Sequence, residues 1–177
     1  MRVDQPVRDR CIAWTDAAGS GMTAVFLWSE KTGWLYTQWR VPKRVIRRLL
    51  PRRDEQIGFL ELAGVALALT TFEHHLRDSA WTCWCDNQGV VGALLKGGTG
   101  AQDLNAIVGQ FWILVAQSCI DLELGRVASA ANIADEPTRG VRTWIDRVQA
   151  EFVAPVLPGW LCDPWLAPDF PHFDVVQ

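Results

Sequence analysis

The stretch Ile57-Gly-Phe-Leu-Glu61-Leu-Ala-Gly-Val-Ala-Leu-Ala-Leu-Thr-Thr-Phe72 decides the fold. It is almost wholly apolar, rich in Ala and Leu, and too long for a strand, so it predicts a helix buried on most sides. Glu61 is the exception, because burying an unpaired carboxylate costs several kcal/mol or raises its pKa. A metal ion would compensate this charge. Alternatively, Glu61 lies in the first turns of the helix and faces solvent.

The length and composition of the chain are those of one globular domain. Its 177 residues are 49% hydrophobic, enough for a substantial core. We predict a domain over residues 1–150 and an irregular tail, rich in Pro and Trp, over 151–177. The apolar run from Ile57 to Phe72 carries Glu61 and is shorter than the roughly 20 residues that span a bilayer, so no membrane segment is expected. The 5 cysteines have no zinc-site spacing and indicate reduced thiols in an intracellular protein, cytoplasmic or nuclear.

Strand-like and helix-like segments alternate in an informative order. Three strands precede the long helix and are joined by short turns, which predicts antiparallel pairing; they lie at 10–16, 22–28 and 34–41. The long helix is predicted at 54–78, and a strand reached across it is most simply parallel to one already in the sheet. Further segments follow: strands at 80–86 and 119–127, and helices at 87–95, at 101–118 and from 135, with a restart at 143. The sequence therefore predicts an α/β fold with a five-stranded mixed sheet, three antiparallel strands then two parallel, flanked by helices.

Acidic residues occur where these elements end or begin. Asp16 ends the first strand and Asp86 ends the fourth, so the two lie side by side if those strands are parallel neighbours. Glu61 comes early in the long helix, and Asp135 starts a later one. Four acids at one sheet edge repel each other unless cations neutralise them. Oxygen ligands suit Mg²⁺ or Mn²⁺, and two such ions about 4 Å apart can promote phosphodiester cleavage.

Basic residues are concentrated in a segment between the third strand and the long helix. Seven of the 17 Lys and Arg residues lie within 14 positions that hold no acid: Arg40, Lys43, Arg44, Arg47, Arg48, Arg52 and Arg53. Such a cluster suits a phosphate backbone, because each neutralised phosphate releases a counterion. It is equally typical of a solvated surface that keeps a protein soluble, and composition alone leaves both interpretations open.

The acids lie in four short motifs: Thr15-Asp16-Ala-Ala-Gly19, Glu61-Leu62, Asp86-Asn-Gln88 and Asn132-x-Ala134-Asp135-x-x-Thr138-Arg139. Together they resemble the four acidic motifs of ribonuclease H, over roughly residues 11–139. The last resembles the Asn-x-Ala-Asp-x-x-Ser-Arg form in ribonuclease H domains of retroelement (LTR/DIRS-like) reverse transcriptases. Each motif alone is a weak signal, because an Asp at a strand end is commonplace. The ordered set, each on its expected element, is a strong one.

This resemblance implies a ribonuclease H-like fold and an endonuclease that hydrolyses the RNA strand of RNA/DNA hybrids with two Mg²⁺ ions, for which Mn²⁺ can substitute. Asp16 would bridge both ions, Glu61 and Asp86 would hold one, and Asp135 would complete the other. The expected partners are the hybrid and a reverse transcriptase domain of the same polyprotein. The expected substrate contacts are Ala17, Ala18, Gly19, Asn87, Gln88, Arg44, Arg47, Arg48, Asn132 and Arg139.

Some features depart from the family pattern or leave alternatives. Many ribonucleases H have a His before the fourth Asp, whereas residues 127–131 contain none. Asn87 has an alternative role as the cap of the following helix. Exonucleases of this fold have a Glu two residues after the first Asp, where this chain has Ala18, and transposases place their Glu after the second Asp. A catalytically weak or inactive scaffold or nucleic-acid-binding domain of a reverse transcriptase is the remaining alternative.

Overall fold

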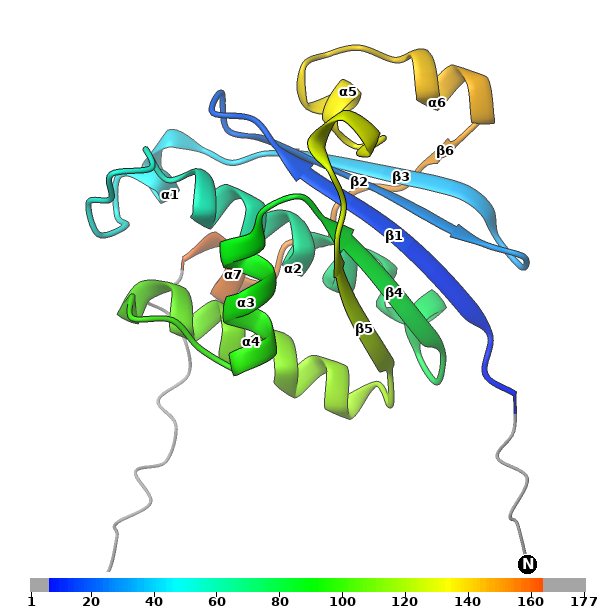
Figure 1. Cartoon of the computed structure of the whole chain (residues 1–177), viewed down its shortest axis with the longest axis horizontal. Coiled ribbons are helices and arrows are strands. Elements are labelled where there is room, and N and C mark those ends of the chain that lie inside the picture. The colour runs from blue at the N-terminus through cyan, green and yellow to red at the C-terminus, as the bar shows by residue number, and fades with distance from the viewer. Residues whose placement is uncertain (1–6, 164–177) are drawn as a thin grey trace, which may run out of the picture.

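The computed structural model describes residues 7–163, which form one mixed sheet with helices on both faces (Figure 1). The strands are β1 (Arg10–Ala17), β2 (Met22–Ser29), β3 (Gly33–Arg40), β4 (Ala80–Cys85), β5 (Asp121–Arg126) and β6 (Glu151–Phe152). The helices are α1 (Lys43–Ile46), α2 (Ile57–Leu76), α3 (Gln88–Lys96), α4 (Gln102–Gln117), the 3-10 turn η1 (Ser129–Ala131), α5 (Asp135–Thr138), α6 (Thr143–Val148) and α7 (Gly159–Cys162).

The strand order is β5-β4-β1-β2-β3-β6. Strands β1, β2 and β3 pair antiparallel, whereas β4 lies parallel to β1 and β5 parallel to β4. This confirms the predicted α/β fold, in which three antiparallel strands are followed by two parallel ones. The predicted number of five strands was wrong, because β6 adds a short sixth strand parallel to β3. The carboxyl ends of β1 and β4 therefore meet at one edge of the sheet.

Helix α2 is the central element of the main core. It packs across β1 and β2 with α4 beside it, and its side chains from Phe59 to Phe72 are buried without a break. Gly64 lets the helix approach β1 closely, since a Cβ there would be 3.6 Å from the backbone O of Asp16. The helix has 20 residues, so the length argument against a membrane span does not hold. It is the one described helix long and apolar enough to cross a bilayer, but 78% of that window is buried inside the protein, as in a core helix.

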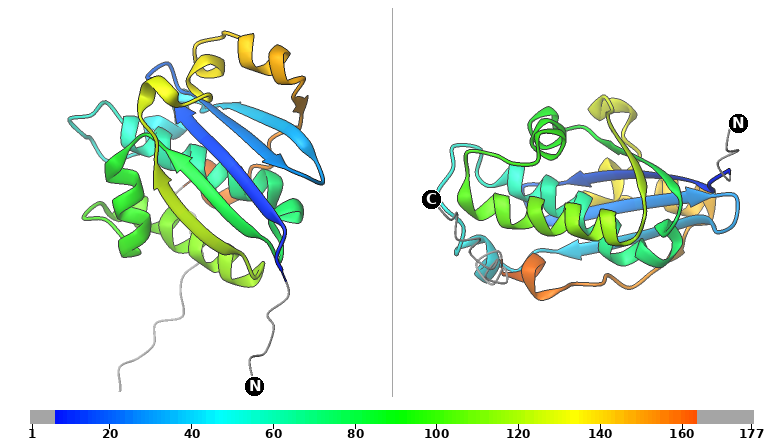
Figure 2. Two further views of the ribbon diagram at one scale, coloured as in Figure 1. Left: turned by 45° about the vertical axis from the view of Figure 1, so that its right-hand side comes forward. Right: turned by 90° about the horizontal axis from the view of Figure 1, so that it is seen from below.

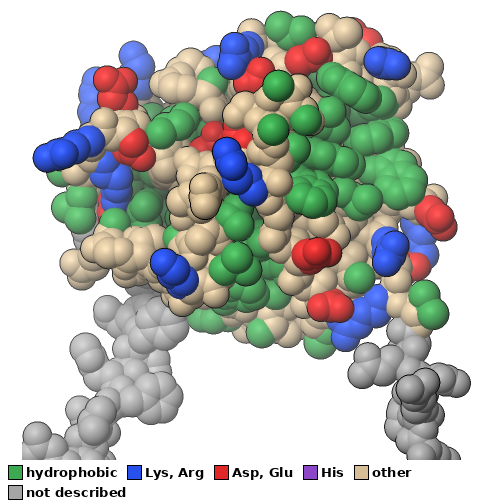
Figure 3. All heavy atoms as spheres, in the orientation of Figure 1, with side chains coloured by type: hydrophobic (Ala, Val, Ile, Leu, Met, Phe, Trp, Pro, Cys, Tyr) green, Lys and Arg blue, Asp and Glu red, His purple; other side chains and the backbone are tan. Residues whose placement is uncertain are grey.

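Helices α5 and α6 lie on the opposite face of the sheet from α2 and α4 (Figure 2). A smaller, aromatic core fills the space beneath them. Trp14 and Trp34 stack with ring centroids 5.5 Å apart, and Phe26 and Tyr36 pack beside them. Hydrophobic side chains gather on this face in the upper right of the view in Figure 3. Sequence alternation accounts for this division, because successive strand residues point to opposite faces.

Several element boundaries differ from those predicted. Helix α2 begins at Ile57 rather than 54, because Glu55 and Gln56 have positive φ angles of 51° and 72°. The carboxylate of Asp54 accepts hydrogen bonds from the N–H groups of Gln56 and Gly58, at 3.1 and 2.9 Å, and so caps the helix start. Strand β4 ends one residue before Asp86, and β5 is shorter than predicted at both ends.

Residues 151–163 of the predicted tail lie against the domain. Strand β6 joins the sheet edge, and Leu161 of α7 is fully buried in the main core. The hydroxyl of Thr70 on α2 donates to the backbone O of Val156 at 2.8 Å, which holds this segment over the helix. The division at residue 150 stays a prediction, and residues 164–177 of the predicted tail lie outside the described residues.

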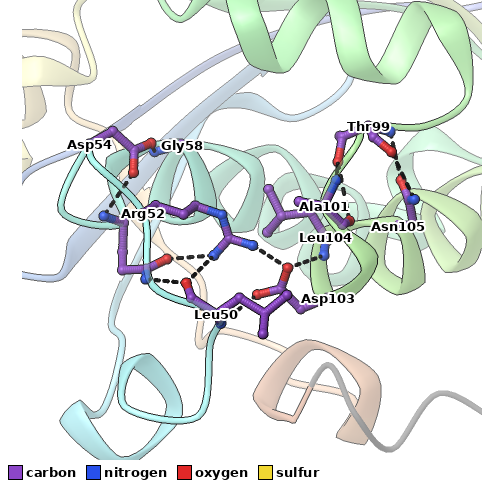
Figure 4. A network of polar contacts seen from close by, with 10 residues as sticks. Leu50, Arg52, Asp54, Gly58, Thr99, Ala101, Asp103, Leu104 and Asn105 are labelled. Carbon is purple, nitrogen blue, oxygen red and sulfur yellow. Dashed lines mark hydrogen bonds and ion pairs between the residues drawn. The ribbon is translucent and has the colours of Figure 1, made fainter.

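The basic segment is anchored to α4 by one buried carboxylate (Figure 4). Asp103 is fully buried, forms an ion pair with Arg52 and accepts the backbone N–H of Leu50 at 3.0 Å. Arg52 also donates to Gln56, the residue before α2, at 2.6 Å. This network fixes the path of the chain from α1 into α2, and with it the start of the helix that carries Glu61.

Asp103→Ala is expected to lower the free energy of unfolding by roughly 2–4 kcal/mol, because it leaves a nearly buried Arg52 without its counter-ion. Asp103→Asn should lower the free energy of unfolding by less, because its side-chain oxygen can still accept the hydrogen bond from the Leu50 N–H. Urea unfolding followed by circular dichroism measures both. Equal stability of Asp103→Ala and the unaltered protein would contradict an anchoring role.

Candidate active site

Three of the predicted acids converge where β1, β4 and α2 meet. Asp16 on β1 and Glu61 on α2 are 3% and 4% exposed, which excludes the solvent-facing alternative for Glu61. The backbone N–H of Ala17 donates to Glu61 Oε1 at 3.3 Å. Ligand atoms of Glu61, Cys85 and Asp86 all lie within 4.8 Å of one another. The structure therefore places the Glu61 carboxylate within reach of a shared ion with Asp86 and directly beside β1.

The fourth acid approaches from α5, which crosses the ends of β1 and β2. Thr138 Oγ1 lies 3.1 Å from Asp16 Oδ2 and 2.7 Å from the backbone O of Asp135, so this hydroxyl links the two motifs. The carboxylate of Asp135 is 35% exposed and pairs with Arg139 one turn later, with 2.9 Å between Nη2 and Oδ1. The charge of Asp135 contributes to the raised pKa of Asp16, so the two carboxylates lie near each other, but Asp135 is not among the residues whose ligand atoms lie within 4.8 Å of one another.

Burial and mutual repulsion strongly raise the pKa values of Asp16 and Glu61. Burial, then the charges of Asp86 and Asp135, raise the pKa of Asp16 from 3.8 to about 7 despite the contact with Thr138. Burial, then the charges of Asp16 and Asp86, raise the pKa of Glu61 from 4.5 to about 9. Carboxyl groups held in this way bind protons at neutral pH unless another positive charge replaces the proton.

The donor set fits a hard divalent cation such as Mg²⁺ or Mn²⁺. Each acid offers carboxylate oxygens, and the raised pKa values of Asp16 and Glu61 are the mark of uncompensated negative charge. Cys85 lies in the same group, with Sγ 3.9 Å from Glu61 Oε2. Burial, and then the charge of Glu61, raise the pKa of this thiol to about 12, so it stays protonated and is a poor ligand. The carboxylates are the residues that could hold the ions.

Two residues not predicted from the sequence support the acids. Ser129 in η1 donates to Asp86 Oδ2 at 2.8 Å. Thr138 contacts Asp16 as described, and its place in the fourth motif was the only sequence signal. Nothing local marks Ser129, because its contact with Asp86 spans 43 positions of the chain.

The residues near the acids that were predicted to contact substrate differ in how far they are exposed to solvent. The turn after Asp16 becomes progressively exposed from Ala17 through Ala18 to Gly19. Asn87 caps α3, since its Oδ1 accepts from the N–H of Val90 at 3.1 Å, whereas Gln88 is exposed at the helix start.

The fourth motif contributes one buried residue and one exposed residue. Asn132 is 5% exposed; its Nδ2 donates to the backbone O of Thr15 at 2.9 Å, and its Oδ1 accepts from Ala134 at 3.2 Å. This side chain holds the loop against β1, which leaves it little surface for a substrate. Arg139 is exposed and paired with Asp135.

The basic segment lies next to the turn after β1. Ile46 of α1 is close to Gly21 of that turn, and the N–H of Val41 donates to the O of Gly21 at 2.8 Å. Arg44, Arg47 and Arg48 are exposed on and just after α1, although Arg48 pairs with Asp163. In the described part of the chain the only histidines are His74 and His75, in the last turn of α2, far from Glu61 at its start.

Comparison with known proteins found no matching family model and no matching curated protein. Solved structures similar to the chain include an N-terminal ribonuclease H domain from Mycobacterium tuberculosis, 13% identical over 75% of this chain and 95% of that one, with a TM-score of 0.47. A second is LC11-RNase H1, isolated from compost, in complex with an RNA/DNA hybrid; it is 13% identical over 81% of this chain and 100% of that one, with a TM-score of 0.48. LC9-RNase H1, a type 1 enzyme with the type 2 active-site motif, is 11% identical over 89% and 81%, with a TM-score of 0.46.

Proposed function

We propose that this chain is a divalent-metal-dependent endonuclease that hydrolyses the RNA strand of RNA/DNA hybrids. The observation that supports it is the convergence of Asp16, Glu61 and Asp86 at one sheet edge, with two of the three buried and with raised pKa values. An uncompensated group of this kind is costly to keep in a core, and a catalytic metal site explains it.

The residues would divide the work as follows. Asp16 would contact two ions, with Glu61 and Asp86 on one and Asp135 on the other. Bound Mg²⁺ or Mn²⁺ supplies an activated water and stabilises the leaving oxygen. Ser129 fixes one carboxylate and Thr138 another, so that the ligands are oriented before substrate arrives. The exposed part of the Ala17–Gly19 turn offers backbone groups to a ribose 2′-hydroxyl, the group that distinguishes RNA from DNA.

The test is cleavage of an end-labelled RNA/DNA hybrid in Mg²⁺, beside duplexes of DNA and of RNA with the same sequence. Selective cutting of the hybrid's RNA strand supports the proposal. Binding of the hybrid without cleavage in Mg²⁺ or Mn²⁺ would establish the non-catalytic scaffold instead.

The origin and location of the protein belong to the same proposal. The motif that ends in Thr138-Arg139 supports descent from a retroelement, with a reverse transcriptase domain of the same polyprotein as partner. All 5 cysteines are free thiols, which supports an intracellular location.

The exposed basic residues around α1 should bind the hybrid. Neutralising Arg44, Arg47 and Arg48 together to Gln is expected to weaken hybrid binding and to flatten its dependence on salt, by about one unit of slope per lost phosphate contact. Because Arg48 pairs with Asp163, Arg44 and Arg47 should account for most of the change. Fluorescence anisotropy at several salt concentrations between about 50 and 200 mM, where such electrostatic effects are large, measures the affinity and its salt slope. An unchanged salt slope would exclude this surface.

A further inference from the structure

A cleft of about 590 Å³ lies beside the acids, between the turn after β1 and the segment that joins α5 to α6. Its walls come from parts of the chain far apart in sequence: the β1–β2 turn, strands β2 and β3, and residues 137–145. The charged residues that line it are all arginines, namely Arg40, Arg139 and Arg142. Polar side chains of Ser20, Gln38 and Thr138 complete the lining.

Contacts within the fold hold the cleft in shape. Gln38 Nε2 on β3 donates to the backbone O of Pro137 at 2.9 Å, which fixes α5 over the sheet. Arg40 Nη1 donates to the backbone O of Ser20 at 3.1 Å, and Arg142 Nη1 donates to the Tyr36 hydroxyl at 3.4 Å. Each guanidinium carries five N–H donors, so these contacts orient the arginines and leave further donors for a ligand.

The cleft shares a wall with the acidic site. Thr138 lines the cleft, and its hydroxyl lies 3.1 Å from Asp16 Oδ2. Ala18 also lines it and directly follows Ala17, whose N–H binds Glu61. A polyanionic strand placed across Asp16 is therefore within reach of the arginines on the far side of Thr138.

We propose that this cleft is a phosphate subsite, which binds a backbone phosphate of the nucleic-acid strand next to the phosphodiester at the acids. This rests on the proposed function for the identity of the strand. Guanidinium groups match phosphate oxygens bidentately. Arg139 and Arg142 also pair with Asp135 and Asp146, at 2.9 and 3.5 Å, so each keeps further N–H donors for a phosphate while Arg40 has no carboxylate partner among the described ion pairs. The arginines also offset the repulsion between the strand and the four carboxylates. Arg40 and Arg142 thereby become binding residues that the acidic motifs do not include.

The experiment measures hybrid binding in EDTA, where no metal-dependent cleavage occurs. Arg40→Gln and Arg142→Gln are each expected to weaken binding about tenfold and to reduce the salt slope by about one. Arg147→Gln is the matched control, because Arg147 is exposed on α6, lies over the Trp144 ring at 5.2 Å and does not line the cleft. Circular dichroism melting confirms that all three variants fold.

A neutral backbone locates the contact. In a series of hybrids, one phosphate of the RNA strand is replaced by an uncharged methylphosphonate at successive positions. When the replaced phosphate is the one at the subsite, the Arg142→Gln variant and the unaltered protein should bind the hybrid with equal affinity. Equal losses for Arg147→Gln, or unchanged slopes for both cleft variants, would overturn the subsite. If the unaltered protein does not cleave the hybrid but the two cleft variants still weaken binding as expected, the proposed hydrolase activity is refuted and the phosphate subsite is not.

Discussion

Asp16→Asn is expected to lower the rate of hybrid cleavage in Mg²⁺ by roughly 10²–10³-fold or more, because it removes a preorganised charge from the centre of the site. Asp16 contacts Thr138 on one side and adjoins the Glu61–Ala17 hydrogen bond on the other. The amide keeps the size and the oxygen that Thr138 meets, so the fold should survive. Single-turnover cleavage of a labelled hybrid measures the loss.

The same substitution should stabilise the metal-free protein at pH 8. The unaltered Asp16 is mostly ionised there while buried and facing other acids, and removing that charge should raise the free energy of unfolding by roughly 1–3 kcal/mol. Glu30→Gln is the control, since Glu30 is exposed in the turn between β2 and β3 and forms no ion pair among the described residues. Retention of full activity, or unfolding of the Asn variant, would each contradict the assignment of Asp16.

Glu61→Gln is expected to remove most of the pH dependence of stability in the metal-free protein. The folded-state pKa of Glu61, about 9, lies above its ordinary value of 4.5, so between these values the folded protein holds a proton that the unfolded chain has released. The contribution of Glu61 to stability therefore falls as pH rises from about 4.5 to about 9, by several kcal/mol, and is fully present below pH 4.5. Asp16 adds a smaller fall between about pH 4 and pH 7.

Urea unfolding in EDTA at several pH values between 5 and 9 measures this dependence. With saturating Mg²⁺ the fall should shrink or reverse, because the ion binds the ionised carboxylates of the folded state only. The Gln variant should show neither the fall nor the full rescue by Mg²⁺. A pH profile that is the same in the unaltered protein and the variant would show that Glu61 is compensated by another group.

The sequence was sufficient for the features that follow from local pattern and chain topology. Alternation and short turns predicted β1 to β3, and the long apolar run predicted α2 and its burial. The parallel crossover then placed Asp16 and Asp86 at one edge, and the structure brings Glu61 to that edge as well. The roles of these acids as metal ligands stay a prediction.

The remaining features depend on contacts between distant segments. The sixth strand consists of two residues, too few to give a period, and it forms because the chain after α6 returns along β3. The start of α2 was misplaced because Asp54 caps it from outside while two residues adopt left-handed backbone angles. The cleft arginines come from β3 and from the segment between α5 and α6, and no local sequence pattern predicts that they lie at the same cleft.

Strand β6 has a further consequence, for self-association. Unpaired strand edges are templates for pairing between molecules. At one edge β6 covers Leu35 and Tyr36 of β3, and the N–H of Val153 donates to the O of Tyr36 at 2.8 Å. At the other edge, β5 exposes Asp121, Glu123 and Arg126, charges that an incoming strand would have to accommodate. One edge is thus covered over two of its residues by the chain itself, and the other carries charged side chains, so strand addition at either edge meets an obstacle.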